Sequence, residues 1–512
     1  MTRFSPVPPG PPALAVARAT PRFLRTATLL AVVGLVGGCA VGPDFRSPTL
    51  EDEAAYRSDP LPAATAAANL PTGDAQRFLE GENVPERWWT TFGNAELNRR
   101  VEQALAHSPT VASAQAALRQ ARENAGISRG ALLPSLDAKL GANRQDNNAG
   151  AAELDSPYTL HNASVDIGYT LDLFGGVRRA IEADTALADE QDHQLDATYL
   201  SLVANVVTTS IREASLRGQI DANNEIIGVF QEQLDLSRKQ FETGVKSKGD
   251  VLVAESQVAT ARAQLPALNK ALAQTQTQLA VYLGQFPSQA QYAALDLDAL
   301  NLPQDLPVSL PSTLVRARPD IRIAEARLHQ ATARVGIATA ELFPSIGLSA
   351  SYGSQALDRG DLFGGDSVAW SLGLNLLQPI FRGGSLRAQK RAAEAGLDRA
   401  SADYRTAVLT AFQNVADSLR ALEYDAEGLA AQALALDATR ESLEQTRRQY
   451  QDGSVAYLQV LDATRLYQQA RIAVIEARAA RLADTAALYT ALGGGVDRLG
   501  DVAGASAGEP AY

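Results

Sequence analysis

The sequence contains a single cysteine, Cys39, so no disulfide can form within the chain and no Cys-x-x-Cys pair can hold zinc. The four histidines, His107, His161, His193 and His329, show no i, i+4 pairing and no HExxH motif. A GxSxG motif, a P-loop and a glycine-rich dinucleotide loop are also absent from the sequence. We therefore expect no catalytic residues, no metal site, no bound cofactor and no enzymatic activity.

Long hydrophobic runs and an excess of positive charge are missing as well. The formal net charge is −12, and residues 1–38 carry four arginines and no acid, so the remainder of the chain has a charge of −16 (−12 less 4). So acidic a chain is a poor candidate for nucleic-acid binding. The apolar run 27–36 falls short of the ~20 residues that a transmembrane helix needs.

This short apolar run has the features of a secretory signal. Arg22 and Arg25 precede it, and Gly37 and Gly38 follow it. The sequence Val-Gly-Gly-Cys at 36–39 resembles a bacterial lipobox, which implies a signal peptide over 1–38 and diacylglycerol and palmitate on Cys39. Ala40, and not Asp, follows the cysteine, which in that resemblance implies sorting to the outer membrane.

The remainder of the chain is an internal duplication. HSPTVASAQAALRQARENAGISRGALLPSL (107–136) aligns with ARPDIRIAEARLHQATARVGIATAELFPSI (317–346), LFGGVRRA (173–180) with IFRGGSLRA (380–388), and FETGVKSKGDVL (241–252) with YQDGSVAYLQVL (450–461). The offset stays between 208 and 210 residues, which indicates two copies of one unit. We divide the chain into an N-terminal segment 39–95, a first repeat 96–284, a linker 285–318, a second repeat 319–493 and a tail 494–512.

Each repeat contains one predicted β-hairpin, over 133–174 and 345–381. Apolar residues alternate with polar ones at Leu136, Ala138, Leu140 and Ala142, and again from Val165 to Leu173. Period two predicts strands, of about the length that crosses an outer membrane. The opposite faces carry Ser, Gly, Asn, Asp and Thr, which suit a water-filled lining.

Helices fill most of the remaining sequence. We expect a helix over about 96–132, long helices over 178–242 and 385–451, and return helices over 250–284 and 457–492. From Leu195 onward, and again 209 residues later, apolar residues recur with the 3.5-residue period of a coiled coil. In the second copy the polar exceptions recur every seven residues, at Ser418, Asp425, Gln432, Thr439 and Thr446, which predicts one wet side of the helix.

Four transmembrane strands cannot close a barrel, and an open edge in lipid leaves backbone groups unpaired. Two copies would give eight strands, a barrel filled by side chains, and three would give twelve, wide enough for water. The polar lining favours three. We therefore expect a homotrimer.

The chain resembles the TolC-like outer-membrane efflux proteins, in particular the lipoprotein branch of the NodT type. The resemblance covers nearly the whole of the chain after residue 38, and is carried by GCAVGPDF (38–45), RWWTTFGNAELN (87–98), RPDIRIAEARLHQATARVGIATAELFPSIGLS (318–349), PIFRGG (379–384) and YLQVLDATR (457–465). It implies a mainly α fold with a small transmembrane β part. In that fold three tandem-duplicated protomers form a 12-stranded outer-membrane β-barrel, which continues as a 12-helix coiled-coil tunnel in the periplasm. An equatorial belt of mixed structure would surround the tunnel.

The resemblance also implies the roles of particular residues. Leu458 and Asp462 would form rings that close the periplasmic gate, with Arg465 one turn further on. Gln459 stands where some relatives have a second aspartate. The residue pattern alone equally fits an exposed Asp462–Arg465 pair. The glycine-bearing turns would contact the adaptor, through Gly244, Val245, Gly249, Asp250, Gly453 and Ser454.

The implied function is that of an outer-membrane lipoprotein channel in a tripartite efflux system. It would conduct drugs and other toxic small molecules passively from an inner-membrane pump, through a periplasmic adaptor protein, to the exterior. The pump would be of the resistance-nodulation-division type. Two alternatives stay open: an exit duct for type I protein secretion, and a non-conducting periplasmic coiled-coil lipoprotein.

Overall fold

The computed structural model describes residues 40–49, 55–146 and 157–494, and Cys39 lies outside them. Within the described part the chain forms two compact units, which we treat separately. One contains residues 40–43, 128–181 and 333–393 and holds the four-stranded sheet. The other contains residues 44–49, 55–127, 182–332 and 394–494 and holds most of the helical structure.

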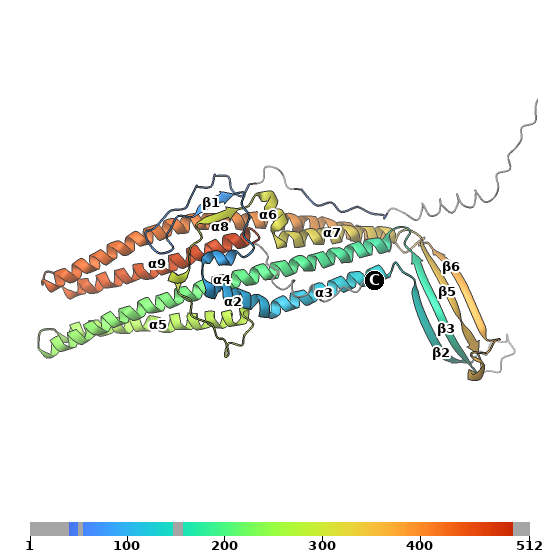
Figure 1. Cartoon of the computed structure of the whole chain (residues 1–512), viewed down its shortest axis with the longest axis horizontal. Helices are drawn as coiled ribbons and strands as arrows, with labels where there is room; N and C mark the ends of the chain where they lie inside the picture. Colours follow the sequence, from blue (N-terminus) through green and yellow to red (C-terminus); the bar gives the residue numbers. More distant parts are fainter. Residues whose placement is uncertain (1–39, 50–54, 147–156, 495–512) are drawn as a thin grey trace, which may run out of the picture. The chain divides into compact units, whose positions relative to one another are not determined.

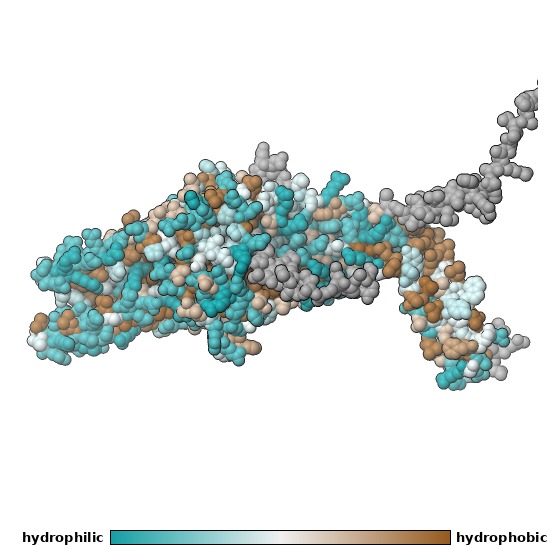
Figure 2. Space-filling model, in the orientation of Figure 1, coloured by the Kyte–Doolittle hydropathy of each residue, from teal (hydrophilic) through white to brown (hydrophobic). Residues whose placement is uncertain are grey.

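The first unit is built on one four-stranded antiparallel sheet in the order β2-β3-β5-β6 (Figure 1). The strands are β2 (Ser135–Gln145), β3 (Tyr158–Leu171), β5 (Ser345–Ala356) and β6 (Val368–Leu377). All four lie inside the two predicted hairpins. The exposed apolar residues Leu136 and Leu140 belong to the alternation that the sequence analysis identified, and Trp370, Leu372 and Leu374 on β6 alternate in the same way. Hydrophobic side chains gather over this sheet in Figure 2.

The two copies produce helices of equal length. The helix α4 (Gly176–Glu242) and its counterpart α8 (Ser385–Gln451) each have 67 residues. The return helices α5 (Lys248–Tyr282) and α9 (Tyr457–Ala491) each have 35 residues. These bounds lie within two residues of the ranges expected from the sequence. Asp172 fixes the start of α4, because its carboxylate accepts the backbone N–H groups of Val177 at 2.9 Å and Arg178 at 3.0 Å.

The expected continuous helix over 96–132 is wrong. The chain forms α2 (Ala95–His107) and then α3 (Pro109–Gly130), with Ser108 extended between them at φ −68°, ψ 123°. Pro109 causes the break, since a proline ring disfavours helical backbone in the preceding residue. The second copy has the same break between α6 (Pro311–Ala317) and α7 (Pro319–Ala340). The counterpart of α2 is therefore α6, which lies upstream of residue 319.

The core of the helical unit lies around two buried tryptophans. Trp88 and Trp89 lie in the 3-10 helix η1 (Trp88–Phe92), and both side chains are buried. The ring of Trp88 is centred 5.5 Å from that of Tyr489. Strand β1 (Arg77–Glu80) pairs in parallel with β4 (Asp305–Val308), joining the N-terminal segment to the linker between the repeats. Two further 3-10 helices are η2 (Leu297–Ala299) and η3 (Arg359–Asp361).

The coiled-coil pattern appears in the burial of the long helices. In α4 the apolar residues that follow the 3.5-residue period are buried, among them Leu195, Tyr199, Leu202 and Val206. In α8 the polar residues at the equivalent positions are all half-buried, which agrees with a water-exposed side of the helix: Ser418, Asp425, Gln432, Thr439 and Thr446. No helix of the described residues has both the length and the apolar content to span a membrane.

Candidate functional site

The two helical hairpins end in the same turn. Gly244 and Gly453 adopt left-handed backbone with φ of 76° and 72°. The N–H of Val245 donates to the carbonyl of Gln240 at 2.8 Å, and that of Ser454 to Gln449 at 2.9 Å. With the bonds Gly244 to Phe241 and Gly453 to Tyr450, both 3.0 Å, each turn is a Schellman cap. The predicted glycine turns therefore have the geometry that requires glycine.

The return helices begin differently after these identical turns. At the start of α5 the Ser247 hydroxyl accepts the N–H of Asp250 at 3.3 Å, and the Asp250 carboxylate accepts the N–H of Ser247 at 3.0 Å. This capping box lowers the pKa of Asp250 through hydrogen bonds from the Ser247 side chain and backbone. In α9 the equivalent positions are Ala456, which makes no side-chain cap, and Gln459.

The residues expected at the gate lie along one side of the first turns of α9. Leu458 is 59% exposed, and the side chains of Asp462 and Arg465 are 63% and 60% exposed. Arg465 lies 4.0 Å from Asp462. Their neighbours Val460 and Leu461 point inward and are buried. Within one chain, Asp462 and Arg465 are thus the exposed i, i+3 pair that the sequence pattern also allowed.

The two hairpin ends meet through a lysine and a tyrosine. The ammonium of Lys246 lies 4.5 Å from the centre of the Tyr457 ring, which in turn packs on Tyr450 with ring centres 5.4 Å apart. Burial raises the pKa of Tyr457 well above its ordinary value. Lys246, next to the predicted tip residue Val245, was missed from the sequence because nothing in its own turn marks the contact.

A cavity of about 370 Å³ lies behind the expected gate residues, among α4, α5 and α9. Its lining includes Asp462, Arg465 and the buried Asn223, whose side-chain amide donates to the carbonyl of Ala261 at 3.2 Å. Two of the three gate candidates, Asp462 and Arg465, therefore share one cavity wall, and Leu458 lies outside it.

The residues that follow Cys39 dock at the end of β3. The N–H of Val41 donates to the carbonyl of Phe174 at 3.1 Å, and Arg179 Nε donates to the carbonyl of Val41 at 3.2 Å. A β-carbon on Gly175, whose φ is 76°, would lie 2.5 Å from the Cα of Ala40. Ala40 therefore has a fixed place beside the strands.

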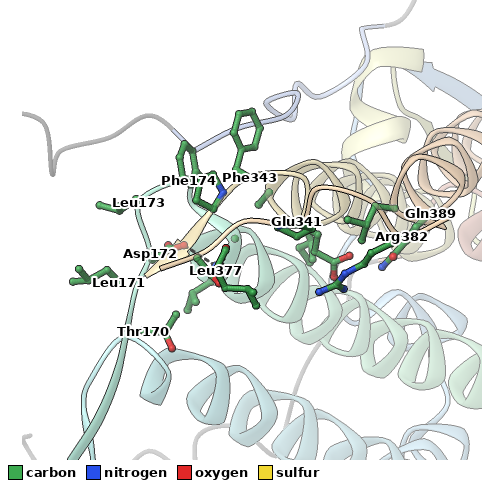
Figure 3. A pocket seen from close by; sticks show the side chains of 18 residues that line it. Thr170, Leu171, Asp172, Leu173, Phe174, Glu341, Phe343, Leu377, Arg382 and Gln389 are labelled. Carbon is green, nitrogen blue, oxygen red and sulfur yellow. Dashed lines mark hydrogen bonds between the residues drawn. The ribbon is translucent and has the colours of Figure 1, made fainter. Parts of the chain in front are cut away.

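A second cavity, of about 560 Å³, lies nearby at the same end of the sheet (Figure 3). Phe174, which follows β3, and Phe343, which precedes β5, stack there with ring centres 4.7 Å apart. Glu341, Arg382 and Gln389 line another part of it. The lining mixes apolar and charged groups.

Three side chains of α4 come together in a way that could hold a cation. Ligand atoms of Asp192, His193 and Asp196 all lie within 4.8 Å of one another. Asp192, however, accepts a hydrogen bond from Arg122 at 3.2 Å, and His193 Nδ1 lies 3.7 Å from Asp196. These contacts are those of surface ion pairs.

A buried arginine of α9 was also missed. Arg481 is fully buried and donates to the carbonyl of Asp74 at 2.6 Å and to the Thr65 hydroxyl at 2.9 Å. Three residues earlier, Arg478 donates to the Thr72 hydroxyl at 3.1 Å. Burial lowers the pKa of Arg481. The contacts attach the N-terminal segment to the C-terminal half of α9, the helix whose first turns carry the expected gate residues.

Comparison with known proteins identifies the family. A family model described as "Outer membrane efflux protein" matches the chain twice, over residues 101–285 and 310–494. The toluene efflux pump outer membrane protein TtgC of Pseudomonas putida is 31% identical over 466 residues, which covers 90% of this chain and 93% of the relative. The pyoverdine export outer membrane protein OpmQ of Pseudomonas aeruginosa is 32% identical over 416 residues, covering 80% and 87%.

Solved structures agree with this assignment. The outer-membrane channel OprN has a TM-score of 0.80 and 29% identity, covering 90% of this chain and all of that one. The open-state MtrE outer membrane channel of Neisseria gonorrhoeae has a TM-score of 0.77 and 27% identity, covering 90% and 99%. The predicted fold, a protomer of a trimeric outer-membrane channel, is confirmed. The chain belongs to the outer membrane efflux protein family and is an efflux channel of the outer membrane with the TolC fold.

Proposed function

We propose that three copies of this chain form the lipid-anchored exit channel of a tripartite efflux system. The channel catalyses no reaction. It conducts small organic molecules passively from an inner-membrane pump of the resistance-nodulation-division type, through a periplasmic adaptor, to the exterior. Relatives of this chain are named for the efflux of toluene, solvents and antibiotics and for pyoverdine export, which supports small apolar or amphiphilic cargo.

One observation carries the proposal: the sheet of four strands ends in β2 on one side and β6 on the other, and both edges lack a partner within the described chain. Unpaired backbone groups in lipid cost several kcal/mol each. Pairing β6 of one protomer with β2 of the next satisfies both edges, and three protomers give twelve strands.

The anchor is proposed from the docking of Ala40 and Val41 beside Phe174. Cys39 directly precedes this fixed point, so acyl chains on its sulfur and on its amino group would start near the base of the membrane-facing sheet. Each buried acyl CH₂ contributes about 0.8 kcal/mol, and several chains on one residue anchor a protein firmly. Diacylglycerol and palmitate on Cys39 therefore fit this geometry.

The adaptor contacts are proposed at the two Schellman turns, with Gly244, Val245, Gly249 and Asp250 in the first. Gly453 and Ser454 are their counterparts in the second. Val245 is 72% exposed, an apolar side chain at the end of a hairpin, which suits burial against another protein. The closed gate is proposed where Leu458, Asp462 and Arg465 of three chains meet near the threefold axis.

The test has four parts. Native mass in detergent should be that of a trimer, and a dimer would contradict the twelve-strand arrangement. The trimer should give ion currents in planar bilayers, whereas a non-conducting coiled-coil lipoprotein would give none. Affinity purification from native membranes should recover an adaptor and an efflux pump; an ABC transporter in their place would point to type I protein secretion. Acyl labelling should be lost in Cys39→Ser.

A further inference from the structure

Three charged residues occupy the polar face of the sheet formed by β2, β3, β5 and β6. They are Asp137 and Lys139 on β2 and Asp166 on β3. The other residues of that face in the four strands are uncharged, and most are Ser, Gly, Asn or Gln. The face therefore carries a formal charge of −1 in each chain.

The strand register places most of these groups at one level. Asp137 pairs with Asp166, Asp166 with Ser351, and Ser351 with Ser371. One level across all four strands thus consists of two carboxylates and two hydroxyls. We call this row of residues the acidic level.

Asp137 and Asp166 repel each other, since like charges directly opposite in an antiparallel pair are destabilising. Lys139 compensates the charge of only one of the two carboxylates. Its ammonium lies 3.1 Å from the carboxylate of Asp166, which also accepts a hydrogen bond from the Ser164 hydroxyl at 3.1 Å. Within the described part of the chain the Asp137 carboxylate makes no ion pair or hydrogen bond. One carboxylate per chain is therefore uncompensated.

The polar face is hollowed at this level. A cavity of about 330 Å³ is lined by Ser164, Asp166, Ser351 and Ser371, together with Asn162 and Gln355. Water and small ions can therefore reach Asp166, Ser351 and Ser371 of the acidic level, and Asp137 beside them on β2 is exposed. An excess of one charge sign along a channel lining concentrates counter-ions.

We infer that the acidic level is a cation-preferring belt in the lumen of the barrel, and that Asp137 determines its preference. This inference rests on the proposed trimer, which repeats the level three times around the lumen and gives it three uncompensated carboxylates. The belt favours cationic and zwitterionic solutes over anions at the membrane end of the channel, independently of the periplasmic gate.

The test measures the local electrostatic potential with reagents that enter the barrel from the outer side, so the state of the periplasmic gate does not affect the result. Ser371→Cys introduces a thiol at the acidic level, and the parent protein, whose only cysteine is Cys39, gives the background rate. The trimer is treated with a methanethiosulfonate bearing a trimethylammonium group and, separately, with one bearing a sulfonate. The readout is the ratio of the cationic to the anionic modification rate.

Adding Asp137→Asn should lower this ratio about twofold or more, and Lys139→Gln should raise it, because it leaves two free carboxylates. The control Asp361→Asn removes the same charge from η3, outside the strands, and should leave the ratio unchanged. An unchanged ratio in Asp137→Asn would overturn the inference and leave the channel intact. A thiol that reacts with neither reagent would contradict a water-filled lumen, and with it the proposed function.

Discussion

Gly42 packs on Gly336 so closely that a β-carbon at position 42 would lie 2.5 Å from the Cα of Gly336. Gly42 also has a φ of 98°, which side-chain-bearing residues rarely adopt. This contact holds the segment that follows Cys39 against α7, and it leaves no room for a side chain at position 42.

Gly42→Ala should therefore release the segment 40–43. Gly81→Ala is the matched control, because Gly81 has a φ of 85° with nothing within 4 Å of an added β-carbon. Both changes should cost about 1–2 kcal/mol for the left-handed backbone. Gly42→Ala should lose more stability than Gly81→Ala, because its β-carbon also collides with Gly336. The difference is measured as the thermal stability of the trimer and as protease cleavage near residue 43. Equal losses in the two variants would show that the contact contributes little.

Folding stability should depend on pH through Asp484. Burial, followed by the neighbouring carboxyl of Asp425, raises the pKa of Asp484 to about 7. An unfolded aspartate has a pKa of about 3.9, so between about pH 4 and pH 7 the folded chain holds a proton that the unfolded chain has released. Stability should therefore fall as the pH rises through this window, by about 2 kcal/mol after allowance for partial exposure, and stay level above it.

Asp484→Asn should remove this dependence and leave the protein more stable than the parent at pH 8. Asp425→Asn should also flatten the curve, because it removes the repelling partner. Asp417→Asn, which changes a more exposed acid on the same helix, serves as the control. Denaturant midpoints at pH 5 and pH 8 measure the effect, and identical slopes in parent and Asp484→Asn would contradict it.

The gate prediction concerns Asp462 and Arg465. Replacing both by Ala should raise the closed-state current in planar bilayers several-fold, since the substitutions remove the side chains that narrow the axis in the proposed trimer. The pair Asp437–Arg440 on α8 has the same spacing and similar exposure, 57% and 55%, and is the control. If both double variants conduct like the parent, Asp462 and Arg465 form only a surface ion pair.

The capping box of α5 can be introduced at the start of α9 by two substitutions. Ala456→Ser with Gln459→Asp should give α9 the box that Ser247 and Asp250 give α5, and stabilise its first turn by about 1 kcal/mol. Hydrogen exchange of peptides covering 457–465 should slow roughly fivefold, which is 1 kcal/mol converted at RT of about 0.6 kcal/mol. Ala456→Val, which lacks an acceptor oxygen, should produce no slowing.

The sequence predicted those features that depend on local pattern. Alternation located the four strands, and Gly244 and Gly453 located the hairpin ends, because period two and left-handed caps leave their mark within a few residues. The proline break at Ser108 had a local signal in Pro109, but the continuous helical pattern on both sides obscured it.

Contacts between segments that are distant in sequence have no comparable local signal in the sequence. Glu213 interrupts the apolar grid of α4 and looks like a surface residue, yet it is fully buried, 2.9 Å from Arg100 and 2.8 Å from Arg217. Arg481 is likewise buried by residues some 400 positions earlier. Polar residues on a coiled-coil seam do not reveal their partners, because burial of a charge depends on which other segment supplies the opposing groups.

The unequal starts of α5 and α9 have a mechanical consequence. After gene duplication the two hairpins kept the same lengths and the same terminal turn, but the second has Ala456 and Gln459 where the first has Ser247 and Asp250. We expect the uncapped end to unwind more readily under load, and this is the end that carries Leu458 and Asp462. Two side chains at the first turns would thus give two hairpins of common origin different stiffness.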